Sequence, residues 1–213
     1  MKVGILLSGC GFYDGTEVAE AVLSALAIER AGGRAVHLSP DSDQFHTVDH
    51  LTGSECESET RHVAKESARV ARGRLHTLDE FFSGELGALV IPGGHGAVKN
   101  LMTNFAAFGA RRELLPSVRT LLSDLHDRRA PIASISLGRT VVQGFLGEPL
   151  SESDMQMPAT EVVVDEERRL VFTPGFLTAT SLAEVAAGIE KMVEAMMRLA
   201  APRLNVIHED RPC

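Results

Sequence analysis

The sequence has little of what marks several specialised classes of protein. It contains no tryptophan, one tyrosine and three cysteines, Cys10, Cys56 and Cys213, with no CxxC pair. An odd number of unclustered cysteines indicates neither a disulfide framework nor a cysteine metal site, so we expect no bound metal and a reducing, cytoplasmic location. Apolar runs long enough to span a bilayer are also lacking, and we expect no membrane association.

Positive charge is scarce as well. The 213 residues include 21 Lys and Arg against 29 Asp and Glu, a formal net charge of −8, and the basic residues are scattered along the chain. This distribution argues against nucleic acid as the main partner. The length and the 44% hydrophobic content predict one globular domain, at residues 1–201, followed by a polar tail at 202–213.

Strand and helix patterns alternate along the first two thirds of the chain. Continuous apolar runs are typical of buried parallel strands; they are residues 2–8, 34–40, 87–94 and 131–135. Helical patterns follow three of these runs; they are residues 16–33, 61–73 and 114–130. Thr16 is a candidate N-cap of the first helix.

The last third has a different pattern, with a β-hairpin expected at 159–176 and a closing helix at 181–200. The whole order predicts an α/β sheet with helices on both faces. Such sheets bind ligands at the carboxyl ends of their strands. Candidate functional residues are therefore sought in three loops, 8–16, 92–100 and 136–140.

Five stretches carry a resemblance to a known family: "LSGCGFYDGTEVAEAV", "HLTGSECESETRHVAKESARVARG", "VIPGGHGAVKNL", "PIASIS" and "VVVDEERRLVFTP". In this order they resemble the ElbB-like branch of the ThiJ/PfpI superfamily, which is related to class I glutamine amidotransferases. The resemblance implies a flavodoxin-like three-layer sandwich with a mostly parallel sheet. It also implies a reactive cysteine on a nucleophile elbow and, in some members, glyoxalase-type activity on small 2-oxoaldehydes.

Ser136 stands at the position that matches the family's elbow cysteine. A cysteine at a helix N-terminus can be a thiolate near neutral pH, whereas a serine hydroxyl needs an adjacent general base. The resemblance points to Glu20 as the acidic residue beside the elbow, with Glu17, one turn earlier, as the runner-up. An unshifted carboxylate is a weak base for a hydroxyl.

Two other residues are candidate catalytic groups. His95 directly follows "PGG" and could form a Ser-His pair with Ser136; the alternative is a loop histidine that points to solvent. Cys10 ends the first strand, so its thiol could be a displaced nucleophile; the alternative is a small residue required by a tight turn.

A ligand-binding set surrounds the elbow. The resemblance implies that the backbone N–H groups of Gly93 and Gly94 form an oxyanion pocket. Leu137, which follows the elbow serine, belongs to the same expected set. Arg139 could bind a carboxylate or phosphate, or it could be a solvated first-turn arginine.

Three functional hypotheses stay open at this stage. The first is an ElbB-like lyase or hydrolase that acts on a small carbonyl compound through Ser136. The second is a binding or regulatory protein that has lost catalysis, and the third is an engineered Cys-to-Ser form of an active enzyme. No cofactor is expected.

The chain also looks shorter than its relatives after residue 147. A shorter segment would leave part of one face of the domain exposed, and a second copy of the chain can cover that face, so we expect a homodimer.

Overall fold

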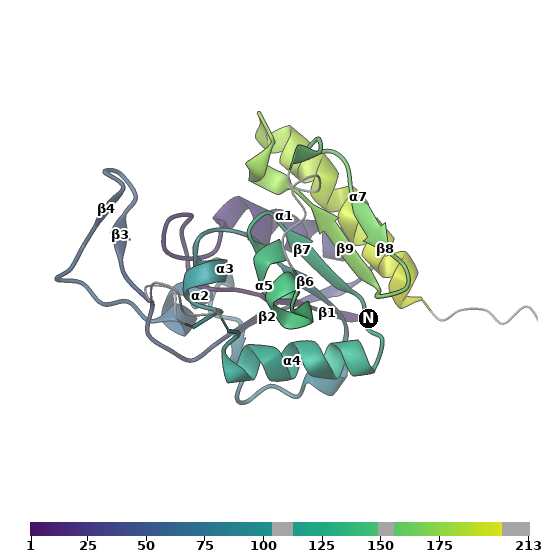
Figure 1. The fold of residues 1–213 in the computed structure, drawn as a ribbon, viewed down its shortest axis with the longest axis horizontal. Coiled ribbons are helices and arrows are strands. Elements are labelled where there is room, and N and C mark those ends of the chain that lie inside the picture. Colours follow the sequence, from purple (N-terminus) through teal and green to yellow (C-terminus); the bar gives the residue numbers. More distant parts are fainter. Residues whose placement is uncertain (104–112, 149–155, 202–213) are drawn as a thin grey trace, which may run out of the picture.

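A sheet of seven strands forms the centre of the protein, with helices on both of its faces (Figure 1). The computed structural model describes residues 1–103, 113–148 and 156–201. Its elements in chain order are β1 (Lys2–Leu6), α1 (Val18–Arg30), β2 (Arg34–Ser39), β3 (Val48–Asp49), β4 (Ser54–Glu55), α2 (Val63–Val70), β5 (Leu75–Thr77), η1 (Ser83–Glu85), β6 (Leu86–Ile91), α3 (Gly96–Lys99), α4 (Pro116–Asp127), β7 (Ile132–Ile135), α5 (Gly138–Leu146), β8 (Val163–Asp165), β9 (Leu170–Thr173), η2 (Gly175–Leu177) and α7 (Leu182–Ala200).

The strands lie in the order β5-β2-β1-β6-β7-β9-β8. All neighbours are parallel except β8, which pairs antiparallel with β9. The chain therefore runs outward from β1 through β2 to β5, then returns to the other side of β1 and continues through β6 to β7. Crevices at the carboxyl ends of strands beside such a reversal are the usual ligand sites of α/β sheets. Among the described helices, none is long and apolar enough to cross a membrane.

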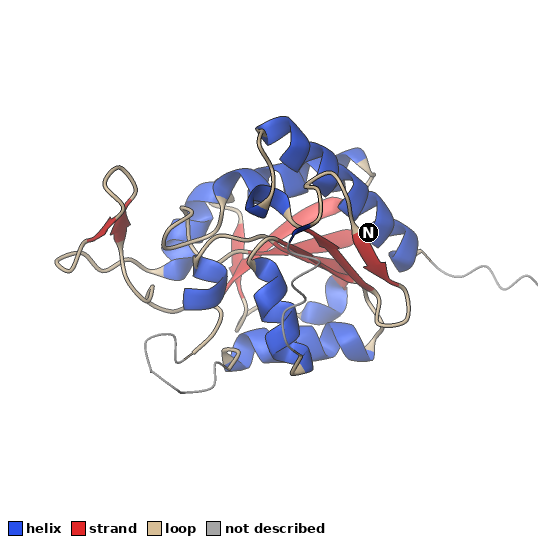
Figure 2. Ribbon diagram, turned by 45° about the horizontal axis from the view of Figure 1, so that its top comes forward, coloured by secondary structure: helices blue, strands red, loops and turns tan. Residues whose placement is uncertain are grey.

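Side chains alternate along the strands between two hydrophobic cores. In β6, Leu89 and Ile91 face the core covered by α3, α4 and α5, whereas Ala88 and Val90 face the core covered by α1 and α7. This alternation follows from the period of two residues in a strand. Figure 2 shows the two helical layers on opposite sides of the sheet.

The mostly parallel sheet between helical layers confirms the expected α/β, flavodoxin-like class. The expected strands and helices are present, with ends shifted by a few residues, and the C-terminal hairpin and closing helix are β8, β9 and α7. The strand β5 was not predicted, because three residues between two turns are too short to show a periodic pattern. The expected polar tail, 202–213, lies outside the described residues.

Thr16 is not the N-cap of α1, contrary to the sequence-based expectation. Its hydroxyl instead accepts a 2.7 Å hydrogen bond from the backbone N–H of Ser8 at the end of β1. Glu17 is the N-cap, and its carboxylate accepts the N–H of Glu20 at 2.6 Å. A carboxylate at this place satisfies an otherwise unpaired helical donor and complements the helix dipole.

The polar segment 41–62 carries the small hairpin β3–β4, which projects from one end of the molecule (Figure 1). Asn100, which is 4% exposed, attaches this segment to the strand ends. Its Nδ2 donates to the carbonyl oxygens of Ser8 (2.8 Å) and Asp14 (2.7 Å), and its Oδ1 accepts the N–H of Phe45 (2.9 Å). One amide side chain therefore joins the loop between β1 and α1 to segment 41–62.

We expect Asn100→Ala to lower the free energy of unfolding by about 2–4 kcal/mol, because two buried backbone carbonyls and the partly buried N–H of Phe45 lose their partner. Urea denaturation followed by circular dichroism measures this loss. Asn100→Asp keeps the acceptor for Phe45 and loses both donors, so it should also destabilise the protein. A loss below about 1 kcal/mol for Asn100→Ala would contradict the assigned role, because that is the size of one ordinary hydrogen bond.

Candidate active site

Ser136 lies on a sharp turn between β7 and α5. Its φ of 51° is in the left-handed region, which is uncommon for a residue other than glycine. The turn is held by two backbone hydrogen bonds, from the Ser136 N–H to the Thr173 oxygen and from the Arg139 N–H to the Ser136 oxygen, both 3.1 Å. A strained turn from strand to helix is the geometry of a nucleophile elbow.

Glycine allows α5 to approach the neighbouring strand at this elbow. A Cβ on Gly138 would lie 2.2 Å from the carbonyl oxygen of Ile91, the last residue of β6. A side chain at this position would therefore force the start of α5 away from the sheet. The close approach also leaves the Ser136 side chain in a confined position, 4% exposed.

Ser136 and Glu20 both approach Gly93 on the side where a side chain would be. A Cβ on Gly93 would lie 2.7 Å from the Ser136 Cβ, and 2.9 Å from both the Ser136 Oγ and the Glu20 Oε2. The hydroxyl and the carboxyl thus lie near each other because Gly93 has no side chain, although no hydrogen bond joins them in the described part of the chain. The structure brings together the two residues that the resemblance pairs.

Glu20 is completely buried and is bound by two backbone donors. Its Oε2 accepts the N–H of Gly93 at 2.7 Å, and its Oε1 accepts the N–H of Phe176, in η2, at 3.2 Å. Burial raises the pKa of Glu20 to about 8, because the two hydrogen bonds offset only part of the cost of desolvation, and the nearby Glu17 adds to the rise. Near pH 7 the carboxyl is therefore mostly protonated.

The choice between the two glutamates is settled by their places on α1. Glu17 caps the helix, and Glu20, one turn later, points between the loop after β6 and the loop after β9. Sequence spacing puts both on adjacent turns and cannot decide which one faces the elbow. The contribution of Phe176 was missed, and its one signal in the sequence is the Pro174-Gly175 turn directly after β9.

His95 does not form the expected pair with Ser136, since no hydrogen bond joins them among the described residues. Its ring lies instead against Phe12 and Tyr13, with ring centroids 4.8 and 6.2 Å away. Burial, followed by the charge of Lys99, lowers the pKa of His95, so the ring is neutral near pH 7. The His95 ring therefore packs against the aromatic residues of the loop after β1 and not beside the elbow.

Cys10 does not have the surroundings of a reactive thiol. Partial burial, followed by the charge of Glu66, raises the pKa of the Cys10 thiol, and the opposing effect of Arg69 is smaller. Because the thiolate is the nucleophile, a raised pKa disfavours attack. The alternative stated above, a small residue at a tight turn, agrees with this environment: a Cβ on Gly15 would lie 2.4 Å from the Cys10 nitrogen.

The expected ligand-binding set is only partly directed at the elbow. The N–H of Gly93 is used by Glu20 and so is not free to act as an oxyanion donor. The Leu137 side chain packs on the core under α5. The guanidinium of Arg139 lies over the Phe172 ring, 5.2 Å from its centroid, and not at a solvated helix end. Gly94, with φ 90°, lets the loop pass against the start of α1.

Residues 1–103, 113–148 and 156–201 contain no group of three or more His, Cys, Asp or Glu side chains that could hold a metal ion.

The pH dependence of stability tests the state of Glu20. Because its pKa in the folded protein is above the value in the unfolded chain, the folded protein binds more protons between about pH 4.5 and 8, and stability falls as the pH rises through this window. Glu20→Gln should remove up to roughly 5 kcal/mol of this fall.

Urea denaturation at pH 5 and at pH 8.5 measures this difference. Glu194→Gln, an exposed change on α7, is the control and should behave like the unmodified protein. Equal pH dependence in the Glu20→Gln variant and the unmodified protein would show that Glu20 is ionised throughout.

No protein-family model matches the chain. It is 34% identical to the mitochondrial ES1 protein homolog of Rattus norvegicus, over 93% of this chain and 84% of the relative. It is 32% identical to the mitochondrial glutamine amidotransferase-like class 1 domain-containing protein 3 of Homo sapiens, over 93% and 83%. An isoprenoid biosynthesis protein with an amidotransferase-like domain, from Ehrlichia chaffeensis, has a similar crystal structure, with TM-score 0.85, 26% identity and coverage of 93% and 99%.

The relatives also correct the expected location. The proteins from rat, human and zebrafish are all named as mitochondrial, so the expectation of a cytoplasmic protein is wrong. It was based on unpaired cysteines, and Cys10 and Cys56 are indeed free thiols. Free thiols indicate reducing surroundings and do not identify the compartment.

Proposed function

The chain belongs to the family of ES1 and glutamine amidotransferase-like class 1 proteins, within the ThiJ/PfpI superfamily, and from this premise we propose that its elbow site acts on a small carbonyl compound. The observation that carries the proposal is the buried Glu20 carboxyl, with a pKa of about 8, which approaches the same side of Gly93 as Ser136. The proposal places the chain in the ElbB-like branch and, by analogy with its relatives, in mitochondria.

The proposed chemistry is of the glyoxalase, lyase or hydrolase type. In its protonated form Glu20 donates a hydrogen bond to the oxygen of a carbonyl group held beside Ser136, which makes the carbonyl carbon more electrophilic. The Ser136 Oγ adds to that carbon to form a hemiacetal. The carbonyl oxygen takes the proton of Glu20, and the hydroxyl proton of Ser136 restores Glu20.

Backbone donors complete the proposed site. Since the Gly93 N–H is engaged by Glu20, the N–H groups of Gly94 and Leu137 are assigned to the substrate oxygen. Among the described residues, no histidine is hydrogen-bonded to Ser136, and the His95 ring packs on Phe12. Without such a base a serine is a poor nucleophile, and we expect turnover to be slow.

Ser136→Cys should raise the turnover of methylglyoxal or glyoxal, because a thiol at a helix N-terminus is ionised far more readily than a hydroxyl. Ser136→Ala should abolish the residual activity. Loss of the 2-oxoaldehyde, followed in a discontinuous assay, measures both effects.

Two matched variants sharpen this test. Ser134→Ala removes a buried hydroxyl without a hydrogen-bond partner on the same strand and should leave turnover unchanged. Cys10→Ala tests whether the Cys10 thiol is the nucleophile, and it should also leave turnover unchanged. Brisk turnover that survives Ser136→Ala would overturn the role of Ser136.

Because Glu20 acts as an acid, the turnover rate should fall above about pH 8, where the carboxyl loses its proton. A turnover rate that rises above pH 8 would show that Glu20 acts as a base.

A second candidate function is ligand binding without catalysis. It is favoured by the lack of a hydrogen-bonded base for Ser136 among the described residues and by the raised pKa of Cys10. The Ser136→Cys variant separates the two candidates, because a protein that retains only binding should gain no turnover from one restored thiol if other groups have also been lost.

The proposal includes a homodimer formed through α1. Val18, Val22 and Leu26 are spaced four residues apart on this helix and are 37%, 51% and 42% exposed, so they form one apolar stripe. Phe176, exposed by 39%, lies beside the start of the stripe, because its N–H reaches Glu20. An apolar stripe of this kind is typical of an interaction surface.

Light scattering at micromolar concentration should therefore give the mass of a dimer. Val22→Asp should shift the protein to monomer, because it buries a charge in the interface. Leu51→Asp is the matched control, since Leu51 is 94% exposed in the β3–β4 turn, away from α1. A monomeric unmodified protein, or equal effects of the two variants, would overturn this interface.

A further inference from the structure

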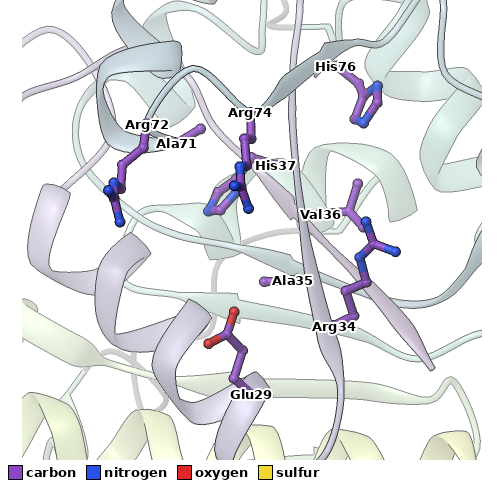
Figure 3. Close-up of a pocket in the computed structure, with 9 residues that line it drawn as sticks. All are labelled: Glu29, Arg34, Ala35, Val36, His37, Ala71, Arg72, Arg74 and His76. Carbon is purple, nitrogen blue, oxygen red and sulfur yellow. The ribbon is translucent and has the colours of Figure 1, made fainter.

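A cavity lies at the end of the sheet opposite to the elbow. Its volume is about 430 Å³, and its walls come from the end of α1, the first half of β2, and the turn between α2 and β5 (Figure 3). The residues that line it are Glu29, Arg34, Ala35, Val36, His37, Ala71, Arg72, Arg74 and His76. Parallel strands place these residues at the amino ends, whereas Ser136 follows the carboxyl end of β7.

The charge of this cavity is opposite to that of the chain. Three arginines and two histidines line it against a single carboxylate, in a sequence with a formal net charge of −8. Within the described part of the chain, none of Arg34, Arg72 and Arg74 forms an ion pair. The neighbouring Glu85 pairs with Lys2.

The side chains converge from different elements. In Figure 3, Arg74 at the start of β5 and Glu29 near the end of α1 point toward each other across the cavity, with Arg34 and Arg72 on opposite sides. Arg72 has a left-handed backbone, φ 53°, followed by Gly73 with φ 77°. This tight turn leads directly from α2 into β5 and so places Arg72 and Arg74 on the same cavity.

The imidazole of His37 adds a second kind of hydrogen-bonding group. Burial lowers the pKa of His37, and the charge of Glu29 offsets only part of this effect. The ring is therefore neutral near pH 7, with one nitrogen that donates and one that accepts. A neutral imidazole and a carboxylate beside arginines suit a ligand that carries hydroxyl groups as well as negative charge.

We propose that this cavity binds a small phosphate ester that carries hydroxyl groups, such as a sugar phosphate. Guanidinium groups bind phosphate oxygens through paired, charge-assisted hydrogen bonds, which assigns Arg34 and Arg74 to the phosphate. Glu29 accepts hydrogen bonds from the hydroxyl groups. The volume lies within the range of small-molecule sites and is larger than a phosphate ion alone requires.

The site is separate from the proposed carbonyl chemistry. Three strand spacings and the length of a strand lie between the cavity and the elbow, on the order of 20 Å. Its occupancy therefore does not depend on Ser136 or Glu20. Failure of the phosphate-ester proposal would leave the proposed function of the elbow unaffected.

Isothermal titration calorimetry with D-ribose 5-phosphate, inorganic phosphate and D-ribose tests the proposal, in low-salt buffer without phosphate or sulfate. D-ribose 5-phosphate should bind more tightly than inorganic phosphate, and D-ribose should give no measurable heat. Arg34→Gln and Arg74→Gln should each weaken the binding of D-ribose 5-phosphate by about tenfold or more. Glu29→Gln should weaken the binding of D-ribose 5-phosphate but not that of inorganic phosphate.

Arg119→Gln is the matched control, because it removes one exposed positive charge from α4, on the other face of the sheet. It should leave the affinity unchanged. No binding of D-ribose 5-phosphate, or the same loss from Arg119→Gln as from Arg34→Gln, would overturn the site. Equal affinity for inorganic phosphate and D-ribose 5-phosphate would overturn the ligand class. All four substitutions change exposed side chains, so we expect each variant to fold, and a thermal unfolding curve checks this.

Discussion

A single buried carboxyl holds the elbow region in place. Glu20 is the point where α1, the loop after β6 and η2 after β9 meet, because it accepts one N–H from Gly93 and one from Phe176. An ionised carboxylate in a fully buried position costs several kcal/mol. The protein reduces this cost by retaining a proton near pH 7. The same group that joins the loops is thereby a neutral acid beside Ser136.

The close packing around Glu20 explains the glycines of this region. A Cβ on Gly93 would lie within 2.9 Å of both Ser136 and Glu20, and a Cβ on Gly175 would lie 2.5 Å from the Glu20 Oε1. Each glycine therefore lets a backbone segment come within hydrogen-bonding distance of the carboxyl. Because these segments follow β6 and β9, on the two sides of β7, they surround the turn that carries Ser136.

The sequence predicted the sheet and the place of the site better than it predicted the contacts within it. Apolar runs identify the strands because burial on both faces leaves no polar alternation, and the parallel order then places the three loops at one edge. Contacts depend on rotation and packing, which residue spacing does not determine. The resemblance named Glu20 as the acidic residue beside the elbow, and the structure places its carboxyl at Gly93, near Ser136. The His95 ring instead packs against Phe12 and Tyr13, a contact between loops that leaves no local signal in the sequence.

The strained backbone at Ser136, with its left-handed φ, determines where the side chain of residue 136 is held. A left-handed φ at a residue other than glycine costs of order 1–3 kcal/mol and persists when the surrounding structure imposes it. Here Thr173 binds the Ser136 N–H and Gly138 sets the start of α5, so the backbone imposes the turn whether residue 136 is serine or cysteine. The scaffold therefore keeps the position of a nucleophile independently of its chemical strength. The identity of one atom, oxygen or sulfur, then decides the rate of the proposed addition step, while Glu20 and the backbone donors stay in place for either.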